Sequence, residues 1–329
     1  MKLYLGLLEI ESSLPGQTRI FGEVDGKLLD LNLSCAAYFA QVESNRTHSY
    51  ELAAYYFPET ITGFLDRGEQ SLKILDLVAA FSHNNGVCGL RGPAGERVVY
   101  DPTEVRILPP FQNPEKSFVI GFSDKARTEA MPKAEIPTAY YKLPQTFVAS
   151  GAPIVWPKFS EEVDADACLA IVIGKAGRRI PPEKAWDYVA GVTLMIDITA
   201  RDINKREGLT TNNLLGKNFP SSTSVGPAVL VARPRKDFEE LAVEFAVDGE
   251  IKQKFALRDC IFAVEQIIAH WSTLGIKPGD WLATGASMAL QRDRLQNPVP
   301  LKVGSTIRCS SPTIGELSHQ VVAAGGVRR

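Results

Sequence analysis

Two apolar segments in the middle of the chain constrain its fold more than any other feature. Residues 169–174 read LAIVIG and residues 189–196 read VAGVTLMI, and neither carries a charge. A short continuous apolar run of this kind is consistent with a strand that is buried on both faces. Further strand signals occur at residues 118–121 and 281–284. We therefore expect buried β-strands to form the centre of the molecule.

Turn and helix signals fill most of the remaining sequence. Asp-Gly pairs at positions 25–26 and 248–249 join short apolar runs, a strong signal for a β-hairpin. The spacing of apolar residues predicts helices, and the segments concerned are 34–42, 60–67, 70–82 and 259–273. The regular strand–helix alternation of a doubly wound sheet does not occur. The pattern predicts an α+β fold that is mostly β.

A proline cluster marks the expected division of the chain. Pro109, Pro110 and Pro114 interrupt the pattern between the helix-rich first part and the strand-rich remainder. We therefore predict an N-terminal α+β region over residues 1–110 and a C-terminal domain over residues 111–329.

Charge and composition argue against several classes of partner. The formal net charge is −2, and no basic block suits a phosphate backbone, so nucleic acid is not expected as a partner. No apolar run approaches the roughly 18–20 residues of a membrane-spanning helix, and the opening residues resemble a strand, not a secretory signal. The five cysteines form no C-x-x-C pair, which argues against a disulfide framework or structural zinc. We expect a cytoplasmic protein.

Sequence motifs for common cofactors and nucleophiles are missing or incomplete. The Gly216-Lys217 pair lacks the first glycine of a phosphate-binding loop, where Thr211 stands, and Asn218 follows the lysine. The sequence contains no G-x-G-x-x-G after a strand and no G-x-S-x-G. No nucleotide cofactor is therefore expected.

The segment from residue 164 to residue 227 concentrates the chemically useful side chains. Asp164, Asp166 and Cys168 alternate along the sequence, so a strand that begins early enough places all three on one face. Asp197 ends the next apolar run, and Lys217 follows twenty residues later. A carboxylate at the end of a buried strand needs a partner such as a cation or an arginine.

Five motifs in this half of the chain resemble those of the fumarylacetoacetate hydrolase family. They read PEKAWDYVAG, DITARD, GK with a later GP, PGD with a later TG, and GEL, and they lie at residues 182–191, 197–202, 216–227, 278–285 and 315–317. The matches cover roughly residues 105–325 in the family's order. The resemblance implies a mixed β-roll catalytic domain, usually dimeric, behind a smaller N-terminal α/β region.

The metal ligands implied by this resemblance are altered here. The family supplies three carboxylates to Mg²⁺ or a similar ion, and an alignment without gaps gives Asp166, Cys168 and Asp197. A thiol is a poor ligand for magnesium, so Mg²⁺ or Mn²⁺ should bind weakly or not at all. A slip of two residues would pair Asp164 with Asp166 and restore three carboxylates.

The lid implied by the resemblance is altered as well. Hydrolases of the family carry a histidine and a glutamate that activate water, and residues 121–130 are the corresponding segment. Arg127 stands in place of the histidine, and Glu129 is one position short. Arginine stays protonated at neutral pH and cannot act as a general base. We expect Arg127 to bind a carboxylate of the substrate or of the protein.

The remaining site residues each have a structural alternative. The resemblance implies that Lys217 stabilises an oxyanion or enolate, and that Tyr141, Lys142, Thr284 and Gly285 bind substrate. Lys217 could instead be a turn lysine. Asp197 could be held by Arg201 or Lys217 without a metal. Arg201 and Asp202 could form a structural ion pair. Cys168 could be a small buried apolar side chain.

The family's chemistry starts from a 2-oxo acid or 1,3-dicarbonyl whose enolate is stabilised in the site. Loss of the lid pair disfavours hydrolysis of a C–C bond. It favours a hydratase or dehydratase, an isomerase, or a decarboxylase. The alternative is a binding or interaction protein that has lost catalysis.

Overall fold

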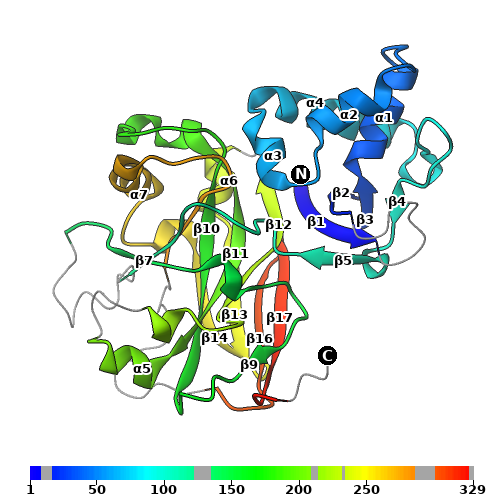
Figure 1. The fold of residues 1–329 in the computed structure, drawn as a ribbon. Coiled ribbons are helices and arrows are strands. Elements are labelled where there is room, and N and C mark those ends of the chain that lie inside the picture. The colour runs from blue at the N-terminus through cyan, green and yellow to red at the C-terminus, as the bar shows by residue number, and fades with distance from the viewer. Residues whose placement is uncertain (9–16, 122–134, 209–213, 232–233, 286–300, 326–329) are drawn as a thin grey trace.

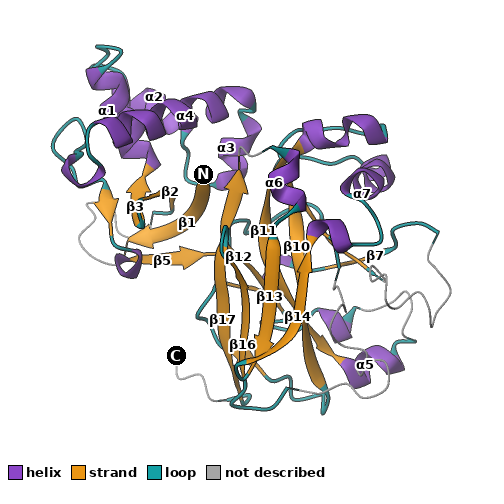
Figure 2. Cartoon of the chain, turned by 180° about the vertical axis from the view of Figure 1, so that it is seen from behind, coloured by secondary structure: helices purple, strands orange, loops and turns teal. Residues whose placement is uncertain are grey.

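The computed structural model describes residues 1–8, 17–121, 135–208, 214–231, 234–285 and 301–325. In this part of the chain, strands form one large sheet and one smaller sheet, with helices beside them. Figure 1 shows α1 to α4 grouped on one side of the molecule, and Figure 2 shows the long strands from behind. The expected α+β, mostly β fold is confirmed.

The large sheet has the strand order β4-β3-β2-β1-β12-β11-β10-β15-β6-β7, with β5 paired to β1 and β8 paired to β12. Its strands in chain order are β1 (Lys2–Leu8), β2 (Arg19–Val24), β3 (Lys27–Asp30), β4 (Val99–Tyr100), β5 (Val105–Leu108), β6 (Ser117–Ile120), β7 (Ala139–Tyr141), β8 (Phe147–Val148), β10 (Val163–Ile173), β11 (Val189–Ala200), β12 (Thr223–Val231) and β15 (Trp281–Ala283).

The smaller sheet has the order β14-β13-β16-β17-β9. Its strands are β9 (Ile154–Val155), β13 (Ala242–Val247), β14 (Glu250–Ala256), β16 (Thr306–Ser311) and β17 (Gly315–Val322). The α-helices are α1 (Leu31–Gln41), α2 (Ser49–Tyr56), α3 (Ile61–Asp66), α4 (Glu69–Asn84), α5 (Arg201–Arg206), α6 (Arg235–Glu239) and α7 (Val264–Trp271). Short 3₁₀ helices are η1 (Val87–Gly89), η2 (Pro102–Glu104), η4 (Pro144–Thr146), η5 (Pro182–Tyr188), η6 (Leu215–Lys217), η7 (Leu257–Asp259) and η8 (Ser272–Leu274).

The two apolar segments form the antiparallel centre of the large sheet. β10 is buried along its whole length, and it pairs with β11 from Val163 opposite Ala200 to Ile173 opposite Val189. Odd-numbered residues of β10 pack into a core shared with the smaller sheet. Cys168, Ala170 and Val172 face the other side, where helices of the N-terminal region pack. Because side chains alternate between the two faces of a strand, β10 contributes to one core on each face.

The strands of the N-terminal region continue the large sheet. β1 pairs with β12, with Leu3 opposite Val229, and the core on that side joins side chains from both regions of the chain. The division at residue 110 remains a prediction, because strands and core both run across it.

Most of the local elements agree with the sequence patterns. Both Asp-Gly pairs form the turns of hairpins, β2–β3 and β13–β14, and Asp25 and Gly26 have positive φ angles of 51° and 75°. The α-helix expected over residues 259–273 is shorter, because residues 260–263 are not helical and the 3₁₀ helix η8 begins at Ser272. In the described part of the chain, no helix is long and apolar enough to cross a membrane.

Candidate functional site

The carboxylates singled out in the sequence lie on one face of β10 and β11. Asp166 of β10 is directly opposite Asp197 of β11, and Asp164 is opposite Thr199. All three carboxylates are buried. Because buried carboxylates require compensating partners, the groups that surround them define the site.

Asp197 is held by two lysines and a tyrosine. The Lys142 Nζ lies 2.9 Å from Asp197 Oδ1, and the Lys217 Nζ lies 2.5 Å from Oδ2. The Tyr140 hydroxyl donates to the same Oδ2 at 2.5 Å, and its ring lies under the Lys217 ammonium, 4.7 Å from Nζ to the ring centroid. Lys217 also donates to the Thr199 hydroxyl at 2.7 Å. Lys217 thus forms the ion pair with Asp197 that was considered as an alternative in the sequence analysis. Lys142 is a second cation that contacts the same carboxylate.

The pKa directions follow from burial and from these contacts. Burial alone would raise the pKa of Asp197, but the charges of Lys142 and Lys217 and the hydrogen bonds from Lys217 and Tyr140 hold it well below its usual range. Burial lowers the pKa of Lys142 to about 8, against the opposing effect of Asp197. Burial, and then the neighbouring Asp197, raise the pKa of Tyr140. Asp197 is therefore an ionised anchor for cations.

Arg201 holds the other two carboxylates. Its Nη2 lies 2.7 Å from Asp166 Oδ2 and 3.2 Å from Asp164 Oδ2. The expected ion pair between Arg201 and Asp202 does not form, because the Asp202 side chain accepts hydrogen bonds from the Ser160 hydroxyl and the Glu161 amide instead. Residues adjacent at a helix start point in different directions, and Arg201 extends back toward β10.

Tyr140 is a site residue that the sequence reasoning missed. Tyr141 lies on the opposite side of β7, where its ring meets that of Phe118 and its hydroxyl reaches the Glu115 carbonyl at 3.4 Å. Tyr140 and Lys142 share one side of β7, and Tyr141 takes the other, because side chains alternate along a strand. Counting back by two from Lys142 would have identified Tyr140.

The substrate-binding roles of Thr284 and Gly285 remain predictions. Thr284 and Gly285 follow β15, and the Thr284 amide donates to the Leu169 carbonyl at 2.8 Å. The hydrogen bonds of the described chain do not join either residue to Asp197. Arg127 and Glu129 fall outside the described residues.

The donors at the expected metal position do not suit a hard divalent ion. Cys168 is fully buried on the same face, among side chains that include Ala170 and Met195, and burial raises the pKa of its thiol. Asp166 and Asp197 are already bound to guanidinium and ammonium groups. Magnesium requires several oxygen ligands free to coordinate it. In the described part of the chain, no cluster of three or more metal-ligating side chains occurs.

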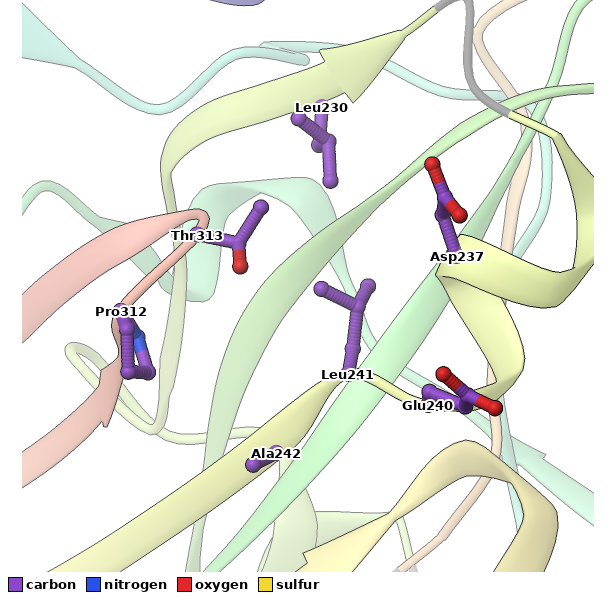
Figure 3. Close-up of a pocket in the computed structure, with 7 residues that line it drawn as sticks. All are labelled: Leu230, Asp237, Glu240, Leu241, Ala242, Pro312 and Thr313. Atoms are coloured by element: carbon purple, nitrogen blue, oxygen red, sulfur yellow. The ribbon is translucent and has the colours of Figure 1, made fainter.

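A separate open cleft of about 370 Å³ lies between α6, the start of β13 and the turn between β16 and β17 (Figure 3). Its lining includes Leu230, Leu241 and Pro312, with Asp237 and Glu240 at the α6 side. None of the three cations or three carboxylates of the Asp197 region lines it. We therefore place the candidate site at Asp197.

Comparison with known proteins agrees with the fold and with the family resemblance. A family model for the C-terminal domain of fumarylacetoacetate hydrolase matches residues 119–322. The chain is 34% identical over 225 residues to the mitochondrial oxaloacetate tautomerase of Xenopus laevis, which covers 67% of this chain and 69% of that protein. It is 30% identical over 268 residues to a mitochondrial oxaloacetate tautomerase of Homo sapiens, with 80% of each chain covered.

A solved structure supports the same fold. Maleylpyruvate hydrolase from Sphingobium sp. SYK-6, in complex with manganese(II) and pyruvate, superposes with a TM-score of 0.68 at 18% identity. The match covers 98% of this chain and 100% of that one. At this identity the likeness concerns the fold.

Proposed function

This chain belongs to the fumarylacetoacetate hydrolase family, and from that premise we propose that it is an enzyme that acts on a small 2-oxo acid or 1,3-dicarbonyl through an enolate. We favour keto–enol tautomerisation, because the two relatives compared above are named for that reaction on oxaloacetate. Other isomerisations, hydration or dehydration, and decarboxylation pass through the same type of intermediate. Hydrolysis of a C–C bond is disfavoured, since Arg127 cannot act as a general base.

The observation that carries this proposal is the placement of the Lys217 ammonium. Asp197 and Thr199 fix its Nζ at 2.5 Å and 2.7 Å, and the side chain is 7% exposed. When a bound carbonyl becomes an enolate, negative charge develops on its oxygen. A fixed ammonium in a poorly solvated site stabilises that charge more than it stabilises the neutral ketone. Lys217 is therefore the proposed oxyanion stabiliser, with Asp197 as its anchor.

Arg201 is the cation that we propose to receive the substrate carboxylate. Its side chain is 28% exposed, whereas that of Lys142 is fully buried. Asp164 and Asp166 hold the guanidinium in one orientation. A planar guanidinium has five N–H donors, enough to bind a carboxylate in addition to these partners.

We further propose that the protein is a cytoplasmic homodimer that uses no nucleotide cofactor and does not bind nucleic acid. The balanced charge and the incomplete phosphate-loop motif support the last two points. Mg²⁺ or Mn²⁺ is proposed to bind weakly or not at all, which the pairing of Asp166 and Asp197 with cations supports.

Replacement of Lys217 tests this function. The wild-type protein should accelerate the conversion of enol to keto oxaloacetate, followed by its ultraviolet absorbance. Lys217→Ala should lower kcat by about 100- to 1000-fold, the usual loss for one oxyanion donor. Lys217 is buried and ion-paired, so circular dichroism must show that the variant is folded.

Lys205→Ala is the matched control, because Lys205 is an exposed lysine of α5 that pairs with Glu162. It should retain the wild-type rate. Near-full activity of Lys217→Ala would contradict the assignment. A wild-type protein that binds oxo acids in a thermal-shift assay without converting any of them would support the binding-protein alternative.

A further inference from the structure

The Lys142 ammonium lies among oxygen atoms deep in the site. Its Nζ donates to Asp197 Oδ1 at 2.9 Å, to the Ser222 carbonyl at 3.1 Å and to the Lys217 carbonyl. The Ser222 hydroxyl is 3.5 Å away, at the limit of a hydrogen bond. The side chain has no exposed surface. A carboxylate, carbonyls and a hydroxyl around one buried positive charge form the type of oxygen cage that hard cations occupy.

Among the described residues of the site, three cations contact three carboxylates. Lys142 and Lys217 contact Asp197, and Arg201 contacts Asp164 and Asp166. These described groups supply three positive and three negative charges. A divalent ion entering among them would face an excess of positive charge, and charge repulsion is stronger in a poorly solvated interior than in water.

Three of the carboxylate oxygen atoms that a divalent ion could use already accept hydrogen bonds from protein groups. Asp197 Oδ1 accepts from Lys142, and Oδ2 accepts from Lys217 and Tyr140. Asp166 Oδ2 accepts from Arg201. Cys168, on the same face of β10, contributes a buried thiol in place of an oxygen ligand. A metal that used these three oxygen atoms would have to compete with the protein cations.

We propose that the Lys142 ammonium is the resident cation of this site, and that it organises Asp197, Ser222 and the Lys217 backbone so that no divalent metal is required. Because Lys142 is fully enclosed, it is a positioning residue that acts through Asp197 and Lys217. The inference rests on the weak Mg²⁺ or Mn²⁺ binding proposed above and names the group that takes the place of the ion, whatever the substrate is.

A Mn²⁺ titration, by calorimetry and by the electron paramagnetic resonance of free Mn²⁺, tests this inference without substrate. Wild-type protein, stripped with a chelator and then freed of it, should show no saturable binding up to about 1 mM Mn²⁺. Lys142→Met removes the positive charge and keeps a flexible chain of similar length. It should bind Mn²⁺ at least about tenfold more tightly than wild type, because an oxygen cage beside Asp197 is left without its cation.

Two further variants sharpen the comparison. Lys205→Met removes an exposed lysine outside the cage and should behave as wild type. Lys142→Met combined with Asp197→Asn removes both charges of the pair and should lose the Mn²⁺ binding that the single variant gains. Circular dichroism and melting curves establish that each protein is folded.

Saturation of the wild-type protein at micromolar Mn²⁺ would overturn the inference, as would a folded Lys142→Met with an unchanged titration. The wild-type titration can overturn the inference even if Lys142→Met does not fold. Because no arm measures turnover, failure of the tautomerase proposal would leave this result unaffected.

Discussion

At the scale of single residues, Tyr140 and Tyr141 show how one position along a strand decides which side chain contacts Asp197. Tyr140 donates to the buried Asp197 carboxylate, while Tyr141 contacts Phe118 on the other side of β7. The two side chains have the same chemistry and differ only in the face of the strand that they occupy. They therefore form a matched pair for mutagenesis.

Tyr140→Phe should destabilise the protein and impair its activity. The change removes one hydrogen bond to an ionised carboxylate and keeps the ring under the Lys217 ammonium. A hydrogen bond to a charged group contributes roughly 1.5–3 kcal/mol to stability. We expect a loss of that size in urea unfolding, together with a lower kcat because Lys217 is less firmly oriented. Tyr141→Phe is the control, and equal effects of the two changes would contradict the placement of Tyr140.

At the scale of elements, His319 joins the two sheets. It lies on β17 of the smaller sheet, and its Nε2 is 2.7 Å from the hydroxyl of Ser224 on β12 of the large sheet. Its Nδ1 is 2.7 Å from the Ala152 carbonyl, so Nδ1 donates and the neutral Nε2 accepts from the serine. The side chain is buried, and burial lowers the pKa of the imidazole below its usual 6.5.

This histidine should make the stability of the protein depend on pH. Because its pKa is lower in the folded state than in the unfolded state, the unfolded chain binds the proton more readily. The contribution of His319 to the stability of the folded protein is therefore fully present above about pH 6.5. It is lost as the pH falls through the pKa that His319 has in the folded state. The free energy of unfolding, measured in urea between pH 7.5 and pH 5, should decrease toward low pH.

His319→Gln keeps hydrogen-bonding capacity without a titratable ring, so its stability should vary less with pH over this range. His83→Gln, at an exposed position of α4, should keep the wild-type dependence. A pH dependence of His319→Gln identical to that of wild type would show that other groups are responsible.

At the scale of the whole molecule, the large sheet holds the chain together. β1 and β12 pair directly, and one core contains Leu3 and Leu5 together with Cys168, Val229 and Trp281. The site thus lies on strands whose opposite face packs against the smaller sheet. Further along β10, Cys168, Ala170 and Val172 pack in the core that contains the N-terminal helices. Asp197, Lys142 and Lys217 are buried, and ion pairs are stronger in such a poorly solvated environment than in water.

The proposed homodimer is tested at this scale. Family resemblance implies a two-fold assembly, and two-fold dimers are the commonest soluble oligomers. Light scattering at micromolar concentration should give about twice the mass of one chain, which is 36.0 kDa. A mass near that of one chain would count against the dimer.

The sequence by itself determined the elements whose signals are local. Apolar runs predicted β10 and β11, Asp-Gly pairs predicted two hairpins, and ordered motifs predicted the family, which the comparisons confirm. The alternation of Asp164, Asp166 and Cys168 also predicted their common face, because the side-chain period of a strand is a property of the backbone. α2, in contrast, has no clear apolar stripe, and only the structure revealed it.

Only the tertiary structure decided which charges meet. Lys142 and Asp197 are 55 residues apart, and Arg201 is 35 residues from Asp166. In the sequence, Arg201 stands beside Asp202, and Asp166 and Asp197 match positions of metal ligands. The folded chain instead gives each carboxylate a lysine or arginine. Ion pairing depends on distance and burial in three dimensions, and neither quantity is encoded in the spacing of residues along the chain.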